Sequence, residues 1–66
     1  IAFAFASVAV VKDIKKNEKF NFENIFPIRP SSGFYKVKDY KKLLGLKAKR
    51  DIKKGSQLKP EDVKKN

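Results

Sequence analysis

One stretch of nine residues occurs twice in this chain, and this repeat constrains the fold more than any other feature. Residues 12–20 (KDIKKNEKF) reappear as residues 50–58 (RDIKKGSQL), at a spacing of 38 residues. The correspondence continues without a gap through residues 21–25 and 59–63, so that it covers fourteen positions. A match of this length in a chain of 66 residues indicates one structural unit that is built twice.

The two copies specify the same turn with different residues. Each has a basic residue followed by Asp, Ile and a lysine pair. A residue that tolerates a positive φ comes next, Asn17 in the first copy and Gly55 in the second. The pattern therefore predicts a pseudo-twofold clasp whose lysines face solvent. Its expected core pairs are Ile14 with Ile52 and Phe20 with Leu58.

The chain is long enough for one small domain only. A chain of 66 residues buries about 60% of its unfolded surface on folding, so its stability is modest. It has no Cys and no His, which excludes a disulfide framework and a Cys/His zinc site. Because it begins at Ile1 and contains no Met, we expect it to be a fragment of a longer protein.

The net charge of +10 makes a basic nucleic-acid-binding module an alternative function. Against it, the basic residues include only two Arg, whereas base and phosphate recognition favours the guanidinium group. The lysines are spread along the whole chain, and no stacked-aromatic RNA signature or DNA-reading helix motif is present. We therefore expect a lysine-rich solvated surface and no nucleic-acid partner.

Short strands and one-turn helices are predicted along most of the chain. Asn21 stands at an N-cap position, Pro60 at a first helical position, and Gly45 where a helix would end. Before and within the first copy, we expect a connecting strand at 1–5, a bend near 6–7, a strand at 8–11 and a helical turn at 22–25. Further along the chain, we expect a helix at 37–44, a strand at 46–49 and a helical turn from residue 60.

The segment between the two copies contains the candidate binding residue. Pro27 and Pro30 fix φ and make this segment extended and stiff, with Gly33 close behind. Arg29 lies between the prolines, and its planar head with five donors suits a carboxylate or amide oxygen. The alternative is an exposed loop arginine without a ligand.

No catalytic site can be assembled from these residues. Without His or Cys there is no conventional nucleophile–base pair, and no glycine-rich loop offers a phosphate cradle. The eleven uncharged residues at the start are too few to span a bilayer, which needs roughly 20. We expect no catalytic residue, metal ligand or cofactor in this chain, no membrane partner, and a cytoplasmic location.

Five motifs occur in order along the chain: AFAFASV (2–8), KDIKK (12–16), IRP (28–30) with Gly33, LG (44–45) and DI (51–52). Together they closely resemble the carboxy-terminal antifreeze-like, or SAF, domain of bacterial N-acetylneuraminate (sialic acid) synthases. The resemblance covers the whole chain and implies a mostly β fold. This fold is a compact β-clip, like type III antifreeze proteins, with short strands, one-turn helices, one short α-helix and an internal pseudo-twofold repeat. Residues 1–7 would be a crossover linker from an absent TIM barrel, and residues 8–66 the domain.

The resemblance also implies a function for the segment around Arg29. In the family, a TIM barrel with a bound divalent metal, Mn or Mg, condenses phosphoenolpyruvate with N-acetylmannosamine to N-acetylneuraminate. The SAF domain crosses to the homodimer partner and covers that subunit's active site. Arg29 and Phe3 match residues at the N-acetyl group of the sugar, and Pro27, Pro30 and Gly33 would support the loop. The partners implied are thus the barrel, the second subunit and the amino sugar.

Two alternatives follow from the same comparison. Synthases of related nonulosonic acids, such as legionaminic or pseudaminic acid, share this domain. The second alternative is ice binding, known for the antifreeze fold. It requires a weakly charged surface, and this chain has 36% charged residues and no Thr.

The chain also departs from the usual Arg-Pro-Gly pattern, because Ser31 and Ser32 precede Gly33.

Overall fold

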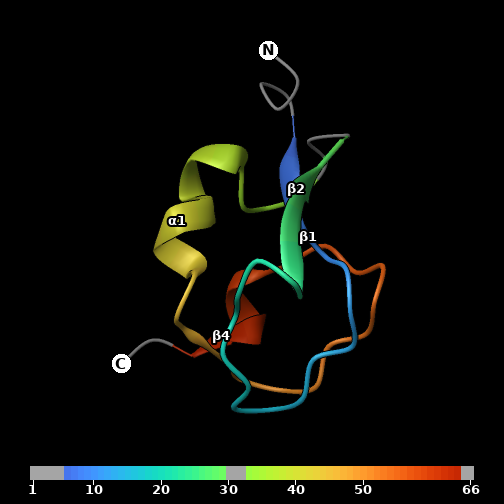
Figure 1. Ribbon diagram of the computed structural model, residues 1–66, viewed down its shortest axis with the longest axis vertical. Helices are drawn as coiled ribbons and strands as arrows, with labels where there is room; N and C mark the ends of the chain where they lie inside the picture. The colour runs from blue at the N-terminus through green and yellow to red at the C-terminus, as the bar shows by residue number, and fades with distance from the viewer. Residues whose placement is uncertain (1–5, 30–32, 65–66) are drawn as a thin grey trace.

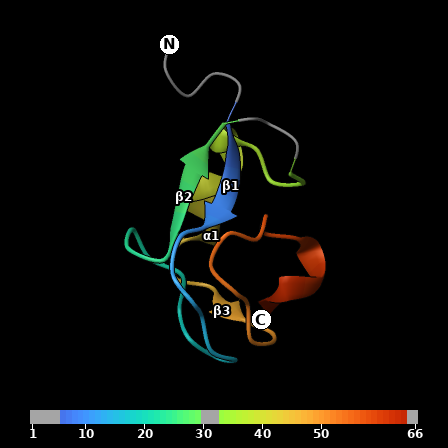
Figure 2. The same ribbon diagram turned by 90° about the vertical axis from the view of Figure 1, so that its right-hand side faces the viewer.

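The computed structural model describes residues 6–29 and 33–64, and every structural statement below concerns these ranges. They form two small antiparallel sheets, one of strands β1 and β2 and one of β3 and β4 (β1, β2 and β4 are labelled in Figure 1, and β3 in Figure 2). The mostly β fold with short strands and one-turn helices is therefore confirmed. The elements are β1 (Ser7–Val10), β2 (Ile25–Ile28), the 3₁₀ turn η1 (Val37–Asp39), α1 (Tyr40–Leu43), β3 (Lys47–Ala48), the 3₁₀ turn η2 (Pro60–Asp62) and β4 (Val63–Lys64).

Hydrogen bonds confirm the pseudo-twofold repeat. Ile14 and Ile52 exchange both backbone bonds, each at 2.8 Å. The Asp side chains cross over: the carboxylate of Asp13 accepts from the N–H of Lys54 at 2.9 Å, and that of Asp51 accepts from Lys16 at 2.7 Å. Each copy therefore caps the turn of the other. In Figure 2 the two segments run close together at the lower edge of the molecule.

The same symmetry extends to the strands that lead into each copy. The N–H of Val10 donates to Ser56 at 2.8 Å, and the N–H of Ala48, 38 residues later, donates to Glu18 at 2.9 Å. The two sheets match as well, since Val10 pairs with Ile25 and Ala48 with Val63. The repeated unit is thus a strand, a turn, an apolar residue and a return strand.

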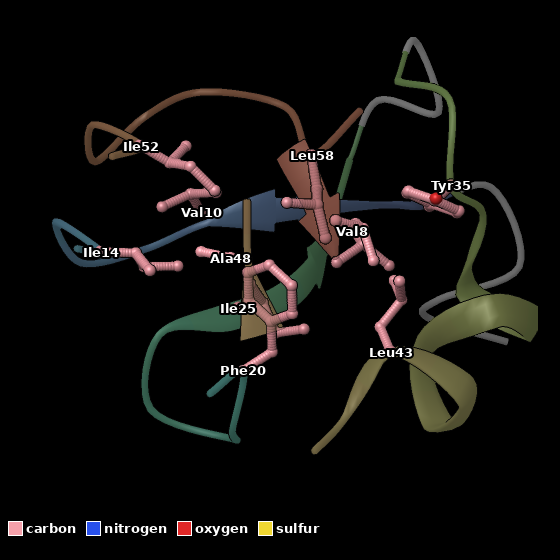
Figure 3. Packing of buried hydrophobic residues seen from close by; sticks show 11 residues of the cluster. Val8, Val10, Ile14, Phe20, Ile25, Tyr35, Leu43, Ala48, Ile52 and Leu58 are labelled. Carbon is pink, nitrogen blue, oxygen red and sulfur yellow. The ribbon is translucent and has the colours of Figure 1, made fainter. Parts of the chain in front are cut away.

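The core lies where the two copies meet (Figure 3). Phe20 and Leu58, the second predicted pair, are both fully buried, and Ile14 and Ile52 are buried as well. Burial of these side chains supplies most of the driving force for folding. The buried cluster also contains Val8, Val10, Ile25, Tyr35, Leu43, Ala48 and Val63.

The predicted helical turn at 22–25 is wrong, because Ile25 opens β2. The side chain of Asn21 accepts from the N–H groups of Glu23 at 2.8 Å and Asn24 at 3.1 Å, so the expected cap is present. It closes only a hydrogen-bonded turn, after which Ile25 pairs with Val10 of β1. In the second copy Pro60 stands at the position equivalent to Phe22 and fixes φ there. The predicted helical turn therefore forms in that copy, as η2.

Two other elements differ from prediction only in detail. The first predicted strand, at 8–11, is shifted by one residue and runs from Ser7 to Val10. The predicted helix at 37–44 begins with the 3₁₀ turn η1 and continues as α1. Gly45, with φ +91°, follows as the expected stop. The connecting strand expected at 1–5 lies outside the described residues.

Replacing Gly55 with Ala is expected to lower the free energy of unfolding by about 1–2 kcal/mol. Gly55 has φ +96°, and an added Cβ would meet no atom within 4 Å, so the cost is backbone strain alone. Urea unfolding of the 66-residue chain measures the change in the free energy of unfolding, and the m value should stay the same. Asn17, with φ +74°, provides the control, because Asn17→Gly should change stability by less than about 0.5 kcal/mol. A Gly55→Ala variant as stable as the parent would contradict the prediction.

Candidate functional site

Arg29 lies directly after β2, and Pro27 within this strand explains how the segment stays straight. Pro27 is buried and pairs with Val8 of β1. Both backbone groups of Val8 point away from β2, since its N–H donates to Tyr35 at 2.8 Å and its carbonyl accepts from Leu58 at 3.1 Å. The missing N–H of Pro27 therefore costs no ladder hydrogen bond. The result is a stiff strand that ends at the exposed Arg29.

Arg29 borders a groove between the second copy of the repeat and the ends of β1 and β2. The groove has a volume of about 370 Å³, and Arg29, Lys54 and Gln57 supply its polar groups. Its remaining lining comes from residues 9–11, Ile28 and Gly55. We call it the Arg29 groove. Two cations and one amide can hold a ligand that offers oxygen acceptors, such as a carboxylate or an acetamido carbonyl.

A partly buried polar cluster surrounds Gly33. The hydroxyl of Ser7 donates to Oε1 of Gln57 at 3.0 Å and accepts from the N–H of Gly33 at 3.2 Å. Nζ of Lys36 donates to the carbonyl of Gly33 at 2.9 Å. A Cβ at Gly33 would collide with Oε1 of Gln57 and lie 3.1 Å from the Ser7 hydroxyl. A larger residue there would have to displace the Gln57 amide from its hydrogen bond with Ser7, which favours glycine.

The structure brings together only some of the predicted site residues. Arg29 lines the groove, Pro27 lies within β2, and Gly33 is bound to Ser7 of β1, whereas Phe3 and Pro30 lie outside the described residues. The sequence did not single out Lys54 or Gln57 as binding residues. Lys54 belongs to the doubled stretch, whose lysines were expected only to face solvent.

Acid–base chemistry has little support within residues 6–29 and 33–64. Burial raises the pKa of Tyr40, and burial followed by the charges of Asp39 and Asp62 raises that of Tyr35. Neither phenol is therefore ionised near neutral pH. No group of three acidic side chains in these ranges could hold a metal ion, and no helix there is long and apolar enough to cross a membrane. The cations and the amide of the Arg29 groove are suited to binding.

The related proteins are synthases named for a nonulosonic acid. The pseudaminic acid synthase of Campylobacter jejuni serotype O:2 is 50% identical over 56 residues, which are 85% of this chain and 16% of the relative. The pseudaminic acid synthase of C. jejuni serotype O:23/36 is 47% identical over 58 residues, 88% of this chain and 17% of its own. That of Helicobacter pylori is 36% identical over 64 residues, 97% of this chain and 18% of its own.

These relatives favour the alternative expectation, a synthase of a related nonulosonic acid, over a sialic acid synthase. The chain spans less than a fifth of the length of each of them. A family model described as the SAF domain matches residues 5–64. Because this match covers nearly the whole chain, the chain belongs to the SAF domain family.

Proposed function

We propose that this chain is the SAF domain of a pseudaminic-type nonulosonic acid synthase and that it caps the active site of a larger domain. The observation that carries the proposal is the position of Arg29. In a chain 50% identical to part of a pseudaminic acid synthase, Arg29 lies at the end of a stiff strand, on a groove shared with Lys54 and Gln57. This arrangement suits a residue that reaches out from a lid.

In this proposal Arg29 binds and orients an amino sugar. An uncharged sugar is positioned by hydrogen bonds, and two N–H groups of the Arg29 guanidinium can converge on the single acetamido oxygen. Closing the site with this donor excludes water and holds the acceptor carbonyl for attack by phosphoenolpyruvate. In this proposal Arg29 binds and orients the sugar and takes no part in proton transfer.

The remaining chemistry belongs to the larger domain. The divalent metal and the carbon–carbon bond formation are assigned to that domain. The lid covers the barrel of the second subunit of a homodimer, so that each active site receives Arg29 from its partner. The 66-residue chain alone would then bind weakly and turn over nothing.

The test is a comparison of acceptor sugars in the full-length protein that carries this domain. With phosphoenolpyruvate and the amino sugar from which pseudaminic acid is made, kcat/KM should exceed that for N-acetylmannosamine by at least about tenfold, a difference of 1.4 kcal/mol in transition-state binding. A preference for N-acetylmannosamine would restore the sialic acid assignment. Turnover by the 66-residue chain alone would overturn the lid.

A further inference from the structure

An exposed apolar strip runs along β2 and the start of α1. The side chains of Phe22, Phe26 and Ile28 are 71%, 41% and 42% exposed, and Tyr40 of α1 packs beside the first two. We call these four residues the β2 strip. A small domain that leaves several large apolar side chains together at its surface forfeits the free energy of burying them, which is typical of an interaction surface.

The β2 strip is held in place before any partner binds. Phe26 and Ile28 share one face of β2, because exposed and buried residues alternate along this strand. The ring of Tyr40 lies 5.9 Å from that of Phe26, edge to face, and 6.3 Å from that of Phe22. The hydroxyl of Tyr40 donates to the carbonyl of Ile25 at 3.0 Å, which fixes the ring. Rigid aromatic groups lose little entropy on binding and are favoured at interfaces.

The charges near the strip restrict the partner. The exposed Lys41 and Lys42 follow Tyr40 directly on α1, and Lys12 lies 4.0 Å from Glu23, which follows Phe22. A second copy of this face would oppose lysines with lysines, in a chain whose net charge is +10. A complementary partner has an apolar surface bordered by carboxylates.

We propose that the β2 strip is the surface through which this domain docks on the larger domain of the synthase. The inference rests on the proposed function. Two observations select this occupant: the relatives are more than five times as long as the matched region, and the strip continues into the candidate site. Ile28 is the last residue of β2 and also lines the Arg29 groove. Docking through the strip thus brings Arg29 to the edge of the interface.

Photo-crosslinking identifies the occupant of the strip in the full-length protein. Phe22 is replaced by p-benzoyl-L-phenylalanine, a change that its 71% exposure tolerates. The crosslinked peptide should come from the larger domain. The same probe at Phe34 is the matched control, since Phe34 is 64% exposed but its ring packs on Tyr35, outside the strip. A crosslink from Phe22 to another copy of this domain, no crosslink, or an equal yield at Phe34 would overturn the inference.

A second variant tests the strip without the probe. Phe22→Asp places a charge against the proposed apolar contact, while the Phe22 side chain contributes little to the folded core. In the full-length variant, the backbone amide hydrogens of β2 and α1 should exchange faster with solvent than in the parent protein. Unchanged protection would contradict docking through the strip.

The proposed function can fail separately from this inference. A crosslink to the larger domain together with unchanged kinetics in Arg29→Ala would keep the docking surface and remove the substrate contact. The reverse result, no crosslink but a raised KM in Arg29→Ala, would remove the strip alone.

Discussion

Arg29→Ala is expected to raise the KM for the amino sugar by about 10- to 150-fold in the full-length protein, because a hydrogen bond to a charged group is worth about 1.5–3 kcal/mol. The side chain lies directly after β2 on the Arg29 groove. In the proposed lid, its removal would leave the sugar oxygen without its donor. Steady-state kinetics with varied amino sugar measures the change, and metal binding by the larger domain should be unaffected.

Two variants sharpen this expectation. Arg29→Lys keeps the charge but loses the planar fork, so its KM should fall between those of the parent and Arg29→Ala. Arg50→Ala is the matched arginine control, because Nε of Arg50 pairs with Asp62 at 2.6 Å and Arg50 does not line the groove. Arg50→Ala should lower the free energy of unfolding and leave the KM for the amino sugar unchanged. Equal effects of Arg50→Ala and Arg29→Ala on the KM would argue against a specific contact.

The repeat allowed much of the fold to be predicted, because its signals are local. A positive φ at Asn17 and Gly55 follows from the residue types alone, and the pairing of Ile14 with Ile52 follows from the phase of the two copies. The sequence does not predict the β2 strand, because the feature that permits it is not local. Pro27 argues against a strand, and only the direction of the backbone groups of Val8, which the sequence does not reveal, makes it acceptable there.

The candidate site was predictable only in part. The contrast between one arginine and many lysines, together with the two prolines, was enough to single out Arg29. The anchoring of Gly33 by Ser7 and Gln57 has no local signal, because those two side chains are 50 residues apart in sequence. Lys54 was read as one of several solvent-facing lysines, and the fold places it on the same groove as Arg29. The doubled stretch therefore contributes to the site as well as to the core.

Phe20→Ala is expected to unfold the 66-residue chain in large part. Phe20 is 1% exposed, and its removal leaves a cavity that costs about 3–5 kcal/mol. A domain of this length has a total stability of roughly 3–10 kcal/mol, at 0.05–0.15 kcal/mol per residue. The loss is therefore comparable to the whole. Thermal and urea unfolding followed by circular dichroism measures it, and Leu58→Ala, at the equivalent position, should behave similarly.

Phe22→Ala is the matched control, because it deletes the same side chain two residues later at a position that is 71% exposed. Its free energy of unfolding should change by less than about 1 kcal/mol, since it gives up mainly the ring contact with Tyr40. The same deletion would then destroy the core at one position and leave the fold intact at the other. If Phe20→Ala unfolded at the same urea concentration as Phe22→Ala, Phe20 would not be a central residue of the core.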